Sequence, residues 1–530
     1  MTTTIEAPLD VSRVIDEPIV QGRGTDLLRY AVPVAAGLVI AGIALRFWTL
    51  SDLWLDEALS VNIAKLPLHQ IPGALRHDGA PPLYYFLLHG WMAAFGTGDF
   101  AVRSLSGLAS VMALPFMWAA GKRVGGRASA WAAVLLMATS PFAITYATAT
   151  RMYALMMLWS ILGLLAMVRA LEQPSRVRVA AVAVMTALII YTHYWGLYFV
   201  FAAAVWLFFR ARRAAPMEDR SALEEQRTSR RVLGAMIIGG ATFLPWLPSF
   251  IFQSLHTGTP WSNAAGPGDV LGVLGEYSGS GPWGAALALL LFTLFLLGLF
   301  GRAIDQQRVL LQLRTRRRVR PIAWVFAGTL SFAVVAGAIA QAAFVGRYAA
   351  VVFPLFILLA GLGAGVFLDR RVMAAVLLVT SLFGLIVGIG ANAEDRTQAG
   401  DVAAVINKDA NAGDLVVYCP DQLGPGVARL INAPVDQATF PHAAPPQRIN
   451  WVNYRQGISD TDVLQFGQDM LGRAGGGHAL WYVWANYPGT NHKCDTLLNL
   501  FQALRPNGQA RVHANHNTSY EYDNLVRFPG

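Results

Sequence analysis

Apolar runs of about 20 residues recur along most of this chain, and they constrain its fold more than any other feature. Each run is long enough to cross a lipid bilayer as a helix, which satisfies its own backbone hydrogen bonds. Hydrophobic residues make up 55% of the chain and charged residues only 14%, whereas a soluble domain carries about 25% charged residues. The sequence therefore predicts a polytopic membrane protein.

Apolar length predicts about eleven membrane spans in a mainly α helical bundle. The expected spans cover 30–47, 101–121, 129–145, 153–168, 177–191, 195–209, 232–252, 283–300, 322–344, 349–368 and 372–391. The segment 82–95 is also apolar but short, so we expect a re-entrant or interfacial helix there.

The basic residues predict the orientation of the bundle. The formal charge is +9, and arginines gather in alternate connections: 122–127, 169–178, 210–231, 302–320 and 369–371. Cytoplasmic connections are enriched in Lys and Arg, so residues 1–29 are predicted to be a cytoplasmic tail without a cleavable signal peptide. The protein is expected in the plasma membrane. Nucleic-acid binding is not expected, because the basic residues do not gather on one soluble face.

Residues 392–530 have a globular composition and follow the predicted membrane domain, 30–391. Strands are expected at 414–418 and 478–484, and helices at 401–408, 460–471 and 496–504, which favours an extracytoplasmic α/β domain. Cys419 and Cys494 both fall here. On an oxidising side they can form a disulfide, and two buried free thiols are the alternative.

Two adjacent carboxylates, Asp56 and Glu57, follow the first span within 48–100, the predicted first outer loop. A carboxylate held at the membrane surface can act as a general base near neutral pH. The alternative is a solvated pair or a helix N-terminus stabilised by its dipole. Because Trp54 and Leu55 would hold the pair against the membrane, we predict a catalytic role for both carboxylates.

Basic side chains at outer span ends suggest an anion site. An outer arginine runs against the positive-inside bias, and its guanidinium can bind a phosphate with two hydrogen bonds. Snorkelling to the interface is the alternative. We predict a site for a lipid phosphate made of Arg151, His193, Arg347 and Tyr348. The predicted substrate-binding set also includes His77, Asp78, Tyr153 and Glu276. The outer loop 253–282 is expected to close over the substrate, and a solvated loop is the alternative.

Several familiar motifs do not occur in the sequence. It contains no P-loop, no Rossmann glycine pattern, no HExxH and no His/Cys spacing typical of zinc. The predicted cytoplasmic connections are short, so a nucleotide-sugar domain is not expected on that side. A group transferred on the outer side must therefore come from a donor in the lipid bilayer. No cofactor is required, and a divalent metal is compatible but not predicted.

Seven stretches together resemble the GT-C glycosyltransferases, and in particular the family-39-like group of protein O-mannosyltransferases and lipid A aminoarabinose transferases. They follow the family's order as WLDEALS (54–60), HDGAPPLYYFLLHGW (77–91), FAVRSLSGLASV (100–111), SPFAITYATATRMYAL (140–155), YTHYWGLY (191–198), LPWLPSF (244–250) and GRYAAVVFPLFIL (346–358). The ordered set carries the resemblance, since no single stretch is specific.

The resemblance implies a GT-C bundle that transfers a sugar, with inversion, from a polyprenyl-phosphate donor at the outer face. Asp56 matches the family's catalytic Asp, and Arg151, His193 and Arg347 match positions near the donor phosphate. Many relatives have an acidic or amide residue just before the arginine, whereas this chain has Thr148-Ala149-Thr150. Any such role must therefore fall to Glu57, to Asp78 or to no residue.

The expected function is transfer of a sugar, with mannose favoured over arabinose, to a hydroxyl group. The acceptor stays open among a glycan, a glycolipid and a protein. The alternatives are a secondary transporter or lipid flippase of envelope precursors, and a non-catalytic scaffold. A transporter would show internal repeats and ionisable residues at mid-bilayer. This sequence instead has its ionisable residues at span ends and in outer loops, without a detectable repeat.

Overall fold

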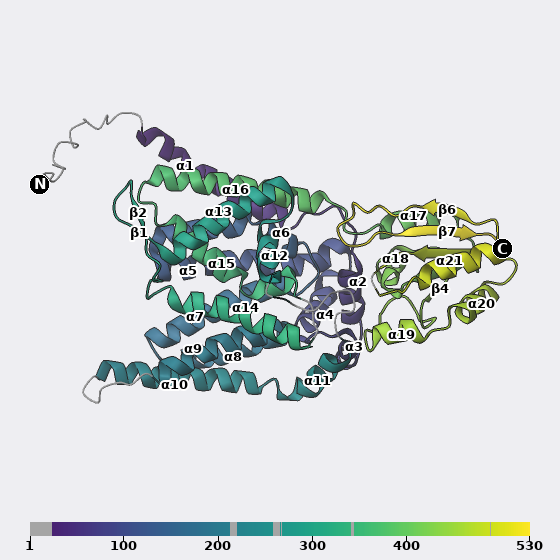
Figure 1. Ribbon diagram of the computed structural model, residues 1–530, viewed down its shortest axis with the longest axis horizontal. Coiled ribbons are helices and arrows are strands. Elements are labelled where there is room, and N and C mark those ends of the chain that lie inside the picture. Colours follow the sequence, from purple (N-terminus) through teal and green to yellow (C-terminus); the bar gives the residue numbers. More distant parts are fainter. Residues whose placement is uncertain (1–23, 213–219, 258–265, 267, 341–343, 488) are drawn as a thin grey trace, which may run out of the picture.

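The protein consists of a long helical bundle with a smaller α/β domain at one end (Figure 1). The computed structural model describes residues 24–212, 220–257, 266, 268–340, 344–487 and 489–530, with side chains from residue 30 onward. Most of the predicted N-terminal tail, 1–23, therefore lies outside the described residues.

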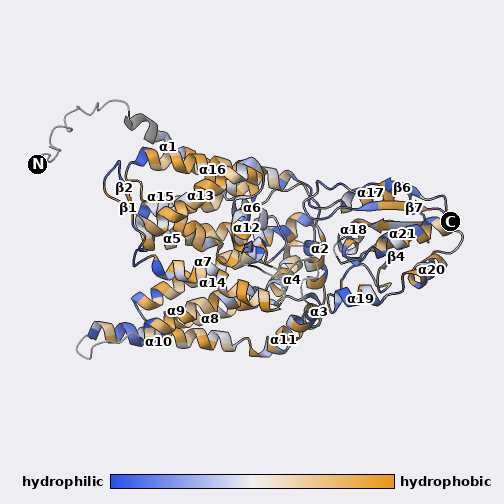
Figure 2. Cartoon of the chain, viewed as in Figure 1, coloured by the Kyte–Doolittle hydropathy of each residue, from blue (hydrophilic) through white to orange (hydrophobic). Residues whose placement is uncertain are grey.

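Every predicted span overlaps a helix of the bundle. The bundle helices are α1 (Gly24–Leu45), α5 (Asp99–Thr139), α7 (Tyr153–Glu172), α8 (Arg176–Thr192), α9 (Trp195–Ala211), α10 (Arg220–Ala241), α13 (Gly281–Phe300), α14 (Arg320–Ala340), α15 (Phe353–Ala364) and α16 (Arg370–Ala393). Within the described residues, six helical segments are long and apolar enough to cross a membrane. Figure 2 shows hydrophobic residues along these helices. The mainly α, multi-pass fold is confirmed.

Helix α5 contains two predicted spans because it is a helical hairpin. Gly126 has φ of 85°, a left-handed conformation that interrupts the helix and suits glycine. A Cβ atom on Gly121 would lie 2.7 Å from the Cα atom of Ala130, so the two halves pack closely against each other. The expected span 101–121 lies in the first half, and the expected span 129–145 begins in the second half but continues past the end of α5 into a separate short helix, Pro141–Ala147.

Short helices gather where the bundle meets the α/β domain (Figure 1). They are α2 (Leu55–Ala64), α3 (Ile71–Asp78), α4 (Leu83–Phe95), α6 (Pro141–Ala147), η2 (Leu244–Trp246), α11 (Leu247–His256), α12 (Asp269–Gly275), η3 (Glu276–Ser278) and η4 (Gly346–Val351). The predicted interfacial segment 82–95 corresponds to α4. Within the predicted loop 253–282, residues 258–265 and 267 lie outside the described residues.

The C-terminal domain is built on a five-stranded mixed sheet of order β4-β3-β5-β7-β6. Its strands are β3 (Leu415–Cys419), β4 (Asp436–Thr439), β5 (Leu480–Trp484), β6 (Gln509–Val512) and β7 (Asn524–Phe528). Strand β3 pairs in parallel with β4 and β5, whereas β7 is antiparallel to β5 and β6. The two predicted strands correspond to β3 and β5, and the predicted α/β class of this domain is confirmed.

Helices cover both faces of this sheet, which explains why β3 is buried along its whole length. They are α17 (Ala399–Asp409), α18 (Gly424–Leu430), α19 (Tyr454–Asp460), α20 (Val463–Ala474) and α21 (Lys493–Leu504), with a short η5 (Asp421–Leu423). One core contains Val402 and Val427, and the other contains Phe466 and Phe501. Trp54 and Leu55 pack into the second core, so the first outer loop is anchored to the C-terminal domain.

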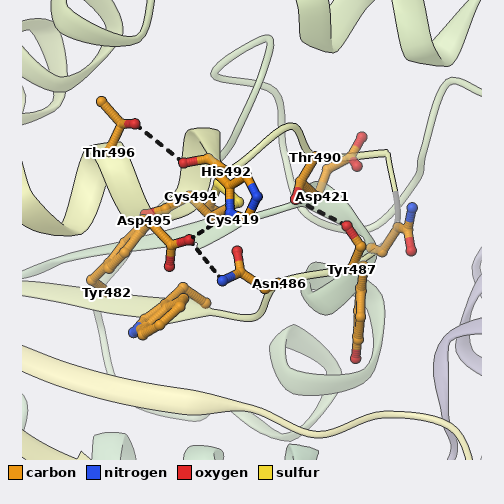
Figure 3. Close-up of a disulfide and its surroundings, with 12 residues drawn as sticks. Cys419, Asp421, Tyr482, Asn486, Tyr487, Thr490, His492, Cys494, Asp495 and Thr496 are labelled. Atoms are coloured by element: carbon orange, nitrogen blue, oxygen red, sulfur yellow. Dashed lines mark hydrogen bonds and ion pairs between the residues drawn. A yellow bond between two sulfur atoms is a disulfide. The ribbon is translucent and has the colours of Figure 1, made fainter.

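A disulfide between Cys419 and Cys494 links the end of β3 to the start of α21, with a Cα–Cα distance of 5.5 Å (Figure 3). Beside it, the Asp495 carboxylate accepts a hydrogen bond from Asn486 at 2.7 Å and lies 3.2 Å from the His492 ring nitrogen. The disulfide closes a loop across 75 residues and so ties two elements that are distant in the sequence.

The opposite end of the bundle carries a small hairpin of β1 (Gly301–Ala303) and β2 (Val309–Leu311) (Figure 1). This hairpin belongs to the arginine-rich connection 302–320. Arg123 of the connection 122–127 pairs with Glu172 at the end of α7, and both line one cavity with Arg210 and Arg318, so these arginine-rich connections lie together. The arginine-rich connections and the C-terminal domain are thus at opposite ends of the bundle.

Candidate active site at the junction of the bundle and the C-terminal domain

Helix α2 begins at the junction, and the C-terminal domain caps its first turn. The backbone N–H of Leu55 donates a hydrogen bond of 2.9 Å to the Glu521 carboxylate, which precedes β7. The first N–H groups of a helix lack partners within the helix, and the Glu521 side chain supplies a partner for one of them. Glu521 therefore fixes the start of α2, where Asp56 and Glu57 lie.

Glu57 points into the protein and is fully buried. Arg103 of α5 donates two hydrogen bonds to its carboxylate, at 2.9 and 2.7 Å, and the backbone N–H of Thr150 donates a third at 2.7 Å. Burial alone would raise the pKa of Glu57, but the charges of Arg103 and Arg396 and these hydrogen bonds together hold it below its ordinary value. Because both oxygens are occupied, this geometry favours a positioning role over proton transfer.

Asp56 contacts a different partner. Its carboxylate oxygen lies 3.8 Å from Nε of Arg151, and its side chain keeps 19% of its surface exposed. The Arg151 guanidinium also donates to the Ser60 hydroxyl at 3.0 Å, one helical turn further along α2. Asp56 is thus an accessible carboxylate held beside a buried cation, which is an arrangement suited to a general base.

Asp78 joins this group from the C-terminal end of α3. Its carboxylate accepts a hydrogen bond of 3.0 Å from the Tyr85 hydroxyl. Burial raises the pKa of Asp78, and both Arg151 and Asp56 are close enough to influence it. The structure therefore brings together three predicted site residues from separate segments: Asp56, Asp78 and Arg151.

The other predicted phosphate-binding residues form an aromatic and basic wall. The His193 ring lies 5.9 Å from the Tyr153 ring and 5.0 Å from the Tyr348 ring, measured between centroids. The Arg347 guanidinium lies 5.9 Å from the centroid of Trp54 and 5.7 Å from that of Tyr348. These contacts place Arg347 beside Trp54, which directly precedes α2.

His193, in the turn between α8 and α9, is a neutral member of this wall. Burial, with the charges of Arg151 and Arg347, lowers its pKa to about 3. Its Nδ1 atom accepts a hydrogen bond of 3.1 Å from the backbone N–H of Trp195, so the proton of the neutral ring is on Nε2. His193 can therefore donate a hydrogen bond to an anion but does not supply the positive charge expected from the sequence.

Three buried polar atoms at this site have no hydrogen-bond partner within the described part of the chain: Nε of Arg151, Nε of Arg347 and the hydroxyl of Tyr153. Buried donors in folded proteins almost always have a hydrogen-bond partner, so these atoms indicate a place where a ligand can bind. Two guanidinium groups and a hydroxyl form a donor set suited to a phosphate.

The structure places His77 and Glu276 around this group rather than inside it. His77 is exposed, and its Nδ1 atom lies 3.1 Å from the side-chain oxygen of Asn450 in the C-terminal domain. The Glu276 carboxylate accepts a hydrogen bond of 3.1 Å from the backbone N–H of Gly346, directly before Arg347. Burial raises the pKa of Glu276. His77 thus contacts the C-terminal domain, and Glu276 fixes the backbone next to Arg347.

Four residues of the site were not predicted: Arg103, Arg396, Tyr520 and Glu521. Arg103 lies two residues inside the predicted apolar span 101–121, and an arginine within such a span is a signal that could have identified it. Arg396 donates to Thr148 at 2.7 Å and lies 3.9 Å from Glu57. Tyr520 stacks on Trp54 with a centroid distance of 4.3 Å. Nothing in the sequence around Arg396 or Tyr520 indicates these long-range contacts.

Part of the chain matches a protein-family model. Residues 79–220 match the family described as dolichyl-phosphate-mannose-protein mannosyltransferase. This match includes Arg103, Arg151 and His193. No curated protein matches the chain in sequence.

Solved structures with the same architecture include ArnT from Cupriavidus metallidurans in the apo state, which is 14% identical, with a TM-score of 0.58 over 96% of this chain and 98% of that chain. The same protein bound to undecaprenyl phosphate gives 14% identity and a TM-score of 0.55 over 95% and 98%. The arabinofuranosyltransferase AftD from Mycobacteria gives 14% identity and a TM-score of 0.53 over 95% of this chain and 40% of that chain.

These likenesses in shape show that the chain has the GT-C fold, which extends through the C-terminal domain in the case of ArnT. The predicted resemblance is confirmed. The family match over residues 79–220 adds the enzyme class, which is that of a membrane glycosyltransferase.

Proposed function

We propose that this protein transfers a sugar from a polyprenyl-phosphate donor to a hydroxyl group at the outer face of the plasma membrane. The observation that carries the proposal is the position of Asp56 beside Arg151, close to a wall that presents Arg347. The solved structure of ArnT with undecaprenyl phosphate supports a polyprenyl phosphate as the lipid. The family description favours mannose as the sugar.

In the proposed reaction, the Asp56 carboxylate accepts the proton of the acceptor hydroxyl. The acceptor oxygen forms a bond to the anomeric carbon, from the side opposite the phosphate. The bond between the anomeric carbon and the phosphate oxygen breaks, and the polyprenyl phosphate leaves with that electron pair. The configuration at the anomeric carbon is inverted, and the proton remains on Asp56 until solvent removes it.

Negative charge grows on the phosphate during this step, and the site offers groups to stabilise it. Arg151 and Arg347 each bring a guanidinium whose buried Nε makes no hydrogen bond, and neutral His193 brings an N–H group. Donors fixed in advance in a water-poor site stabilise a developing anion better than water does. Because phosphate is already a good leaving group, the proposal needs no metal ion.

The proposed orientation places the N-terminus in the cytoplasm and the C-terminal domain outside. The arginine-rich connections at the opposite end of the bundle support this orientation. The Cys419–Cys494 disulfide supports an oxidising location for the C-terminal domain. The acceptor, which is proposed to be a glycan, a glycolipid or a protein, would approach Asp56 from this side.

A donor panel tests the proposal. Purified protein in lipid nanodiscs is mixed with a cell-envelope fraction and radiolabelled polyprenyl-phosphate mannose, polyprenyl-phosphate arabinose or a nucleotide-linked mannose. We expect the polyprenyl-phosphate mannose alone to label the acceptor. Labelling by arabinose would correct the sugar, and labelling by the nucleotide sugar would contradict the donor class. If no polyprenyl-phosphate sugar binds or reacts, the proposal fails.

A further inference from the structure

A cavity of about 540 Å³ lies between the bundle helices at the end opposite the C-terminal domain. Residues of α5, α7, α8, α9, α10, α14 and α15 line it, and its inner walls are apolar, with Leu164, Met167, Val182, Val200 and Val325 among them. This volume lies within the range of about 300–1,000 Å³ that small-molecule sites occupy. The cavity is separate from the site around Asp56, and no step of the proposed transfer uses it.

Basic side chains surround one end of the cavity. Arg123, Arg210 and Arg318 line it together with Glu172. Arg123 is paired with Glu172 at 2.6 Å, and Arg210 is paired with Glu225 at 2.8 Å. Arg318 is exposed and belongs to the basic segment 314–320, which leads into α14. Three guanidinium groups therefore face two carboxylates, which leaves a positive charge at this end.

The combination of apolar walls and a cationic end indicates the chemistry of the ligand. A free anion would leave the apolar walls unfilled, whereas a neutral lipid would not engage the arginines. Nearby helix surface is apolar and exposed, with Phe208 and Phe209 at 40% and 60% exposure, as expected next to lipid. Basic pockets between helices at a membrane surface bind anionic lipid headgroups.

We propose that this cavity binds one anionic phospholipid. One of its two acyl chains would occupy the apolar space between Leu164 and Val200, and its phosphate would lie at Arg318 and the neighbouring guanidinium groups. This inference does not depend on the proposed transfer reaction, because it rests on a different part of the bundle.

Native mass spectrometry of the purified full-length protein tests this site. The protein is delipidated in mild detergent and titrated with phosphatidylglycerol, or with phosphatidylcholine carrying the same acyl chains. We expect one phosphatidylglycerol to be retained, at least tenfold more tightly than phosphatidylcholine. Equal retention of the two lipids would overturn the proposal, since the arginines would then contribute nothing.

Three variants locate the bound lipid. Arg318→Gln removes an exposed charge at the cavity and should weaken phosphatidylglycerol binding about fivefold. Val200→Trp should block the chain site and abolish retention. Arg314→Gln is the matched control, because Arg314 is exposed in the same segment but does not line the cavity.

Identical binding by the wild type, Arg318→Gln and Val200→Trp would place the lipid elsewhere. Displacement of phosphatidylglycerol by equimolar undecaprenyl phosphate would also overturn the assignment.

Discussion

Glu57 and Arg103 form a buried ion pair with two hydrogen bonds, while the adjacent Asp56 lies beside Arg151. Neighbouring residues on a helix point about 100° apart, so the side chains of Asp56 and Glu57 lie in different environments. Glu57 ties α2 to α5 and to Thr150, the residue directly before Arg151. Glu57 thereby holds Asp56 and Arg151 in position.

We expect Glu57→Gln to destabilise the protein by about 3–5 kcal/mol, because Arg103 would keep a buried and uncompensated charge. Thermal unfolding in nanodiscs measures the loss as a lower melting temperature. Asp436→Asn is the control, since its ion pair with Arg473 is exposed and should contribute little. Equal melting temperatures for Glu57→Gln and the wild type would contradict the structural role of this pair.

Arg347 should contribute mainly to donor binding. Arg347→Gln is expected to raise the Kd for a polyprenyl-phosphate sugar about 10- to 100-fold, because a charge-assisted contact to phosphate would be lost. Equilibrium binding of a fluorescent polyprenyl phosphate measures the change. Arg473→Gln, an exposed arginine in the C-terminal domain, controls for net charge. The assignment of Arg347 is wrong if both variants bind the donor as the wild type does.

Tyr520 brings the C-terminal domain into the site through its stacking on Trp54. Tyr520→Ala should lower kcat/KM for transfer by up to about tenfold, which corresponds to the loss of one aromatic pair. Tyr520→Phe keeps the stacked ring and should retain most of the activity. If the two variants lose activity equally, the hydroxyl rather than the stacked ring is the important group.

Asp523 makes the stability of the C-terminal domain depend on pH. Burial and the nearby charge of Asp401 raise its pKa to about 7, and Glu521 also lies close to it. A carboxyl group with a raised pKa costs stability as it ionises, so the domain should lose stability as the pH rises from about 4 to 7. Asp523→Asn should reduce this loss by roughly 2–4 kcal/mol.

Melting temperatures between pH 4 and pH 8 give the measurement for Asp523. Asp462→Asn provides a comparison, because Asp462 caps α20 from an exposed position. A wild-type melting temperature that rises steadily over this range, with the same slope in Asp523→Asn, would contradict the assignment.

Hydropathy predicted the bundle because each membrane span must be apolar and must satisfy its own backbone hydrogen bonds in the lipid. Both requirements act within one stretch of sequence. The same argument predicted β3 and β5, which are apolar along their length. It did not predict β6, the edge strand Gln509–Val512, because this strand is short and mostly exposed, with polar Gln509 and Arg511 among its residues. Tertiary pairing, rather than the local pattern, makes β6 a strand.

The site likewise contains residues that the sequence indicated and contacts that only the structure reveals. Motifs drew attention to Asp56, Arg151 and Arg347, which lie in stretches with a recognisable family order. The pairing of Glu57 with Arg103 depends on how α2 packs against α5, which no local pattern specifies. The contact of Tyr520 with Trp54 joins residues more than 460 positions apart, and only the position of the C-terminal domain reveals it.

The central claim is that Asp56 removes the proton from the acceptor, and one pair of measurements on Asp56→Asn tests it. Donor Kd and the single-turnover rate of transfer are measured on the same nanodisc preparation. We expect a nearly unchanged Kd and a rate reduced by about 10²–10⁴-fold, the usual contribution of a general base. A rate within a few-fold of the wild type would show that Asp56 is not the base.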